Sequence, residues 1–163
     1  MNINNPSVSF VRPANTTQYA VGNLVANSTT AGSVVPMAFV LGNAFGVGSF
    51  RITRARLTKS SVGVTSATFR VHLYQSTAPT CANGDGGAWS TNGALNWLGN
   101  IDVSSMLAFT DGATGTGSFP AGSEGFIKTA SGATIYALLS DLGTYTPVSG
   151  ETFTLTLEEL DAY

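Results

Sequence analysis

The sequence is short of charged residues, which make up 10% of its 163 residues, whereas about a quarter is usual in soluble domains. A hydrophobic content of 43% nevertheless excludes a charged, disordered chain and is enough to form a core. The polar surface must therefore consist largely of Thr, Ser, Asn and Gly. The length favours one domain that covers residues 1–163.

Other absences narrow the class of protein. A net charge of −2 provides no basic field that would attract nucleic acid. No apolar run reaches the length of about 18 residues that a membrane span needs, and "MNINNPSVSF" lacks the basic and apolar regions of a secretory signal. Cys81 is the only cysteine, so no disulfide can form within the chain. These features predict synthesis in a reducing cytoplasm, with no nucleic-acid or membrane partner.

Short runs of β-branched and aromatic residues alternate with clusters of Gly, Ser, Asn and Pro, as in all-β domains. In "TFRVHLY" (68–74) and "TFTLTLE" (152–158), every second residue is apolar, which predicts strands with one buried face. The Gly-rich "DGATGTG" (111–117) is expected to form a turn. The sequence predicts a jelly-roll-like β-sandwich of about eight antiparallel strands. The expected strands are 7–12, 34–41, 50–59, 66–75, 100–106, 124–129, 134–141 and 151–160, with a short edge strand within 21–26.

Side chains suited to catalysis or metal binding are scarce. His72 is the only histidine and is expected at the surface or in an interface, although the many serines leave a Ser–His–Asp arrangement open. One His and one Cys do not make a zinc site, and "NGDGG" around Asp85 lacks the closing Glu of a calcium loop. No phosphate-binding glycine motif is present. The sequence therefore predicts a protein that is not an enzyme and holds no metal or cofactor.

The stretch "FRITRARLTK" (50–59) holds four of the seven basic side chains of the chain. A β-bulge near Thr53–Arg54 would bring all its apolar residues to the core side, namely Phe50, Ile52, Ala55 and Leu57. Three cations would then share the outer face: Arg51, Arg54 and Arg56. Because like charges on one sheet face repel, we expect them to pair with carboxylates, either Glu158 and Glu159 or those of a neighbouring subunit.

The long loop 76–99 contains both tryptophans, Trp89 and Trp97. Large rings of this kind pack against something, so the loop is expected to cover an open end of the sandwich or to contact a partner. The two rings are also compatible with a platform for a sugar.

Four segments carry a resemblance to a known family, in this order along the chain: "RPANTTQYAVGNLVANSTTAGSVVPMAF", "FRITRARLTKSS", "ATFRVHLYQSTAPTCANGDGGAWS" and "YTPVSGETFTLTLE". The chain resembles the capsid cement or decoration proteins of tailed bacteriophages. The resemblance implies a jelly-roll-like fold and a place on the capsid exterior of the virion after synthesis in the host cytoplasm. It also implies binding to the major capsid protein as a homodimer or homotrimer.

Residues 1–16 are expected to form an extended N-terminal arm that adds to a neighbour's sheet. The residues expected at the interfaces come from this arm, the basic strand and the long loop: Phe10, Arg12, Arg51, Arg54, Arg56, Trp89 and Trp97. Two alternatives stay open. One is a carbohydrate- or receptor-binding module of a head or tail fibre, and the other is a ring-forming tail-tube or head-completion component.

Overall fold

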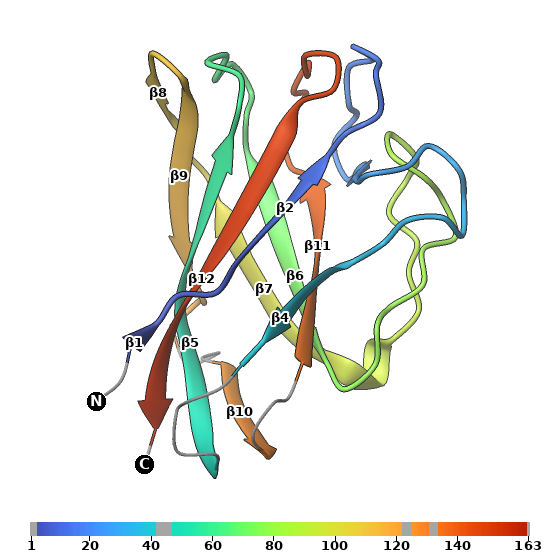
Figure 1. Ribbon diagram of the computed structural model, residues 1–163. Coiled ribbons are helices and arrows are strands. Elements are labelled where there is room, and N and C mark those ends of the chain that lie inside the picture. The colour runs from blue at the N-terminus through green and yellow to red at the C-terminus, as the bar shows by residue number, and fades with distance from the viewer. Residues whose placement is uncertain (1–2, 42–46, 122–124, 131–133, 163) are drawn as a thin grey trace.

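The computed structural model describes residues 3–41, 47–121, 125–130 and 134–162, which form two antiparallel sheets packed face to face (Figure 1). In the seven-stranded sheet the order is β1-β12-β5-β9-β8, with β2 also paired to β12 and β10 to β5. In the five-stranded sheet the order is β3-β11-β6-β7, with β4 also paired to β11. This arrangement confirms the predicted all-β sandwich, while the jelly-roll connectivity stays a prediction.

The strands, in chain order, are β1 (Ile3–Asn4), β2 (Ser7–Val11), β3 (Leu24–Val25), β4 (Met37–Val40), β5 (Val47–Lys59), β6 (Phe69–Gln75), β7 (Trp97–Val103), β8 (Leu107–Phe109), β9 (Gly112–Ser118), β10 (Gly125–Ala130), β11 (Thr134–Asp141) and β12 (Thr152–Ala162). One 3₁₀ turn, Ala94–Asn96, precedes β7. Three pairs of short strands share one edge of a longer strand. β1 and β2 follow each other along β12, β3 and β4 along β11, and β9 and β10 along β5. Three strands of the structure were not predicted from the sequence: β1, β8 and β9.

The N-terminal segment, expected to be an extended arm that adds to a neighbour's sheet, pairs within its own chain in the described residues. β1 and β2 both pair with the chain's own β12, in a register that places Phe10 opposite Phe153. The two strands in the described part of residues 1–16, β1 and β2, therefore form an edge of the seven-stranded sheet. The physical reason is that β12 is long enough to pair with two short strands on one edge while β5 occupies the other.

Period-2 patterning fills the core as predicted. In β6, Phe69, Val71 and Leu73 have no exposed surface, and the same holds for the alternating apolar residues Phe153, Leu155 and Leu157 of β12. The Phe69 ring packs edge-on against Phe153 from the opposite sheet, with centroids 5.4 Å apart. This contact joins the two sheets at the centre of the molecule.

The predicted β-bulge is present. Glu158 of β12 pairs with Arg54, but the next residue, Glu159, pairs with Ile52, so Thr53 is the extra residue on β5. The bulge allows the apolar side chains on both sides of it to point into the core, and Ile52, Ala55 and Leu57 are buried. The side chain of Phe50 lies outside the described residues.

The prediction of a turn at 111–117 was wrong, because Gly112–Ser118 is strand β9. Its glycines serve a close approach between chain segments. A Cβ added at Gly117 would lie 2.2 Å from the carbonyl oxygen of Asp102, and one at Gly115 would lie 2.4 Å from that of Ser105. β9 can therefore lie against the segment around the end of β7 only where side chains are missing.

Candidate interaction surfaces

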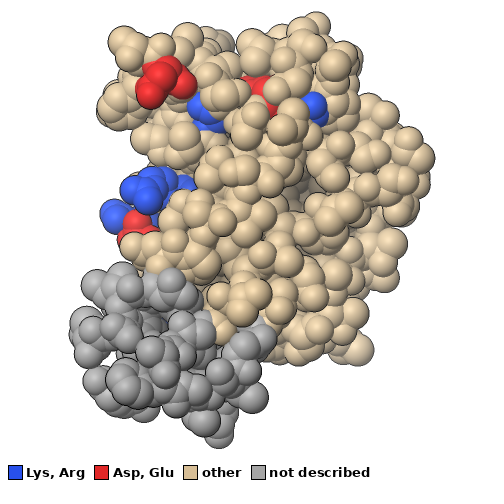
Figure 2. Space-filling view, viewed as in Figure 1, with Lys and Arg blue, Asp and Glu red and all other residues tan. Residues whose placement is uncertain are grey.

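The outer side of the seven-stranded sheet carries cross-strand pairs of hydroxyl groups. Ser7 and Thr156 are 3.0 Å apart, Ser9 and Thr154 are 2.7 Å apart, and Thr58 and Thr114 are 3.0 Å apart, each measured between hydroxyl oxygens. We call this surface the hydroxyl face, and define it by Ser7, Ser9, Thr58, Thr114, Thr116, Thr154 and Thr156. The alternate threonines of β12 and β9 are the sequence signal for it. Few charged side chains are visible in Figure 2, as the composition predicts.

One of the expected ion pairs lies on this face. Arg54 donates to both carboxylate oxygens of Glu158, at 2.7 and 2.8 Å, which confirms that pairing. The pair is solvent-exposed and therefore contributes little to stability. Arg56 is exposed opposite Thr156 and Thr116, and forms no ion pair with the described residues. It is therefore available for an anionic group of a partner. Arg51 is half-buried on the same strand.

A shallow depression of about 420 Å³ lies next to Arg56 on the hydroxyl face. Its walls include Thr58, Thr114 and Phe109. Phe109 is 52% exposed and Leu107, two residues before it on β8, is 65% exposed. Asp111 also lines the depression, so cationic, anionic, hydroxyl and apolar groups lie together on one surface. The sequence prediction missed β8, because a strand of three residues is too short to show alternation.

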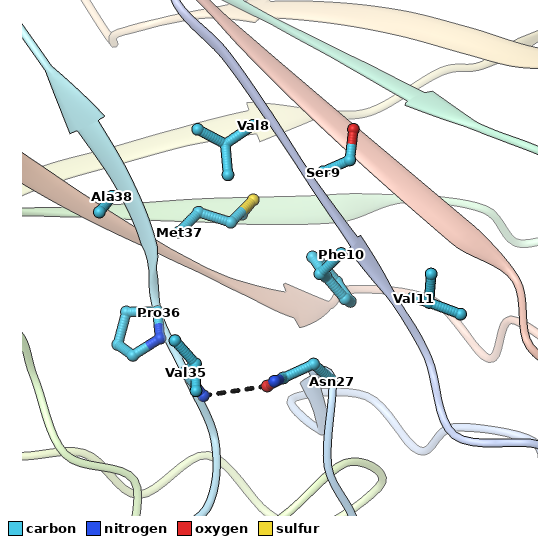
Figure 3. Close-up of a pocket in the computed structure, with 9 residues that line it drawn as sticks. All are labelled: Val8, Ser9, Phe10, Val11, Asn27, Val35, Pro36, Met37 and Ala38. Atoms are coloured by element: carbon cyan, nitrogen blue, oxygen red, sulfur yellow. Dashed lines mark hydrogen bonds between the residues drawn. The ribbon is translucent and has the colours of Figure 1, made fainter.

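A second concave surface lies along the edge of the sandwich between β2 and β4 (Figure 3). It is a groove of about 540 Å³, and none of the described residues that line it is charged. Val8, Phe10 and Met37 face the space between the two strands. The Phe10 ring stacks on Phe153, with centroids 5.6 Å apart. We call this surface the edge groove.

Arg12 lies inside the molecule. Its guanidinium bonds the Asp85 carboxylate at 2.6 Å, and both side chains are 1% exposed. It also donates to the Tyr19 hydroxyl, which in turn donates to Asp85 at 2.7 Å. Burial would lower the pKa of Arg12, but the hydrogen bond to Asp85 and the neighbouring charges raise it, so the cation persists. Arg12 thus stabilises the fold, in place of the expected contact with a partner.

A second buried ionic cluster lies where β5 ends and β12 begins. The Lys59 ammonium lies 3.4 Å from the Glu151 carboxylate, and both side chains have no exposed surface. Lys59 also donates to the Tyr145 hydroxyl at 3.0 Å and to the Ser61 carbonyl at 2.9 Å. Burial lowers the pKa of Lys59, and the Glu151 charge opposes that shift. The cluster fixes the chain that leaves β5 against the start of β12.

Asp141, at the end of β11, is a buried carboxylate of another kind. Among the described residues, no donor makes a hydrogen bond of normal geometry to either carboxylate oxygen. Burial raises the pKa of Asp141 to about 6, and the nearby backbone N–H groups of Tyr145 and Gly143 oppose this rise. The folded protein therefore favours the protonated carboxyl.

We expect Asp141→Asn to change how stability depends on pH. The folded pKa is above the ordinary 3.8, so this group favours folding below about pH 4 and loses that contribution as the pH rises through about 6. The free energy of unfolding of the variant, relative to that of the original protein, should be on the order of 2 kcal/mol higher at pH 7.5 than at pH 4. Urea unfolding at both pH values measures this difference. A constant offset from the new amide cancels in the comparison, and a difference that does not change with pH would contradict the assignment.

The outer side of the five-stranded sheet is covered in part by the loop that follows β6. Trp89 stacks on His72 with centroids 3.8 Å apart, and packs against a cluster that includes Tyr74, Cys81 and Leu138. The loop thus lies on a sheet face rather than over an open end of the sandwich. Trp97 begins β7 instead of lying in the loop, and it is 48% exposed.

His72 is not arranged as part of a Ser–His–Asp triad. It lies 3.0 Å from the hydroxyl of Ser140, which is buried, while both oxygens of Asp102 bind Arg70 at 2.6 and 2.7 Å. Burial and the Arg70 charge lower the pKa of His72 to about 4. Cys81 is buried, and burial raises the pKa of its thiol. The structure thus places neither His72 nor Cys81 at an open site.

The residues expected at interfaces do not form one site. Arg54 and Arg56 lie on the hydroxyl face, and Phe10 lies in the edge groove. Trp89 and Trp97 lie at the five-stranded sheet, where Trp89 packs on His72 and Trp97 begins β7. Within the described ranges, no group of three His, Cys, Asp or Glu residues is placed to hold a metal ion. No helix in this part of the chain is long and apolar enough to cross a membrane. In comparisons with known proteins, no family model and no curated protein matches the chain.

Proposed function

We propose that this protein is a non-enzymatic structural component of a bacteriophage virion. It would act as a cement protein that binds the major capsid protein on the outer capsid surface and stabilises contacts between capsomers. The observation that carries the proposal is the hydroxyl face with Arg56, Leu107 and Phe109 beside it. Protein interfaces combine apolar and aromatic anchors with an arginine and a hydrogen-bonding rim in this way.

The interior of the molecule supports the same role. The two buried ionic clusters, around Arg12 and Lys59, tie connecting segments to the ends of the strands. A surface held in one conformation before binding loses little conformational entropy on binding. That property suits a protein whose task is to hold neighbouring capsomers in fixed positions.

The jelly-roll connectivity is part of this proposal. The order β2-β12-β5-β9 in one sheet lies against β4-β11-β6-β7 in the other. The chain thus passes between the sheets several times, and eight strands in two sheets are what a jelly roll contains. This order supports the proposed topology and the resemblance on which the capsid role rests.

Capsid binding by a Phe109→Ser variant tests the proposal. We expect affinity for capsids of the encoding phage, stripped of this protein, to fall at least about tenfold, because interface aromatics carry much of the binding energy. Val148→Ser is the matched control, since Val148 is 48% exposed and Phe109 is 52% exposed. Equal occupancy of both variants would contradict the role of this face. A few copies at one vertex, or glycan binding abolished by Trp97→Ala, would favour the alternatives.

A further inference from the structure

β2 has a free edge. It pairs with β12 on one side, and among the described residues no strand pairs with its other side. Ser7, Ser9 and Val11 are exposed along it. Protein edges of this kind are usually protected by Lys, by an inserted Pro or by a bulge. β2 has none of these between Pro6 and Pro13, so its five residues form a short edge with which another strand can pair.

The hydrogen bonds to β12 show which backbone groups point outward. The Arg12 N–H donates to Glu151 at 2.9 Å, and Pro6 accepts from the Leu157 N–H at 3.0 Å. Hydrogen-bonded and non-hydrogen-bonded pairs alternate along an antiparallel ladder. The backbone N–H and C=O groups of the even-numbered residues of β2 therefore point toward β12. The N–H and C=O groups of Ser7, Ser9 and Val11 therefore point away from the sheet.

The side chains of β2 make its free edge self-complementary. Val8 and Phe10 face the edge groove, whereas Ser7 and Ser9 lie on the hydroxyl face. A strand that pairs with this edge has to offer the same alternation of apolar and small polar residues, with no charge. The sequence SVSFV of β2 meets that requirement, since a second β2 brings no charged side chain to a groove whose described lining residues carry no charge.

We infer that two copies of this chain pair antiparallel through β2, around a two-fold axis at Ser9. Ser9 lies opposite the partner's Ser9, and Ser7 lies opposite the partner's Val11, so every outward N–H and C=O group of β2 gains a partner. Val8 lies opposite the partner's Phe10 on the groove side and covers apolar surface. The two seven-stranded sheets become continuous across the dimer. Such a contact is isologous and closes, so it gives a dimer and no fibre.

Cysteine cross-linking tests the register. Residues opposite each other at a hydrogen-bonded pair have Cα atoms about 5.5 Å apart, which a disulfide can bridge, so Ser9→Cys should form a covalent dimer under mild oxidation. The Ser7 residues of the two copies would be about 14 Å apart, at about 3.4 Å per residue, so Ser7→Cys should not. Cys81 is buried and gives little background. Equal cross-linking of both variants, or none by Ser9→Cys, would overturn the inference.

Charge at the axis tests the contact itself. Ser9→Lys places two like charges opposite each other and should weaken dimerisation at least tenfold in sedimentation equilibrium. Thr58→Lys is the matched control, because each change removes one exposed hydroxyl pair from the same face. A purified protein that is monomeric at about 200 μM, or a dimer unaffected by Ser9→Lys, would overturn the inference. The inference does not rest on capsid binding, so the isolated protein decides it separately from the proposed function.

Discussion

Replacing Lys59 with methionine should lower the free energy of unfolding by about 3 to 5 kcal/mol. The ammonium group lies 3.4 Å from the Glu151 carboxylate, and neither side chain has exposed surface. Methionine fills much of the same space but leaves Glu151 as a buried charge without its cation. Tyr145 and Ser61 still donate to Glu151, at 2.8 and 2.6 Å, and these two hydrogen bonds do not replace the lost charge. Guanidinium unfolding followed by far-UV circular dichroism measures the loss.

A double variant separates charge from packing. Lys59→Met combined with Glu151→Gln removes both charges and should be more stable than Lys59→Met alone, because no uncompensated charge remains. Arg54→Met is the surface control, since the Arg54–Glu158 pair is exposed, and it should change stability much less than Lys59→Met. If Lys59→Met cost no more than Arg54→Met, the buried pair would not have the role assigned to it.

Arg12→Met should also destabilise the protein by about 3 to 5 kcal/mol. The change strands the buried Asp85 carboxylate, which bonds Arg12 at 2.6 Å and accepts from the Tyr19 hydroxyl and the Ala26 N–H. It also removes the long bonds from Arg12 to the carbonyl groups of Asn15 and Val148, at 3.4 Å each. Thermal and guanidinium unfolding would show the loss.

A second measurement distinguishes this role from a surface role. Arg12→Met combined with Asp85→Asn should recover part of the stability, because the remaining amide is neutral. Arg56→Met, on the hydroxyl face, should leave stability within about 0.5 kcal/mol of the original protein. Unchanged unfolding of Arg12→Met would mean that Arg12 acts at a surface, as the sequence interpretation expected.

Much of the fold could be predicted from local patterns. Alternation in β6 and β12 identified their buried faces, because side chains on a strand point to opposite sides with a period of two. The loss of that alternation between Ile52 and Ala55 predicted the bulge at Thr53. β9 was missed because its glycines carry no apolar pattern, and their function depends on how closely another segment approaches.

The candidate surfaces were harder to predict. The Arg54–Glu158 pair could be expected because both residues lie on the outer faces of strands that pair. Nothing local distinguishes Arg12 from the exposed arginines, since its partner Asp85 lies far along the chain. The same holds for Lys59. Its position in the strand predicts that it points inward, but nothing local predicts that Glu151 is its partner.

The sequence by itself determined the class of fold, the inward residues of the long strands and the scarcity of charge on the surface. Each of these depends on composition or on the period of two along a strand. Only the tertiary structure decided which cations are buried with a carboxylate, which strands share an edge and which edge is left free. Those properties depend on pairings between residues far apart in sequence. The alternation of apolar and polar residues in a strand is compatible with several partner strands, and the packing of the two sheets selects one of them.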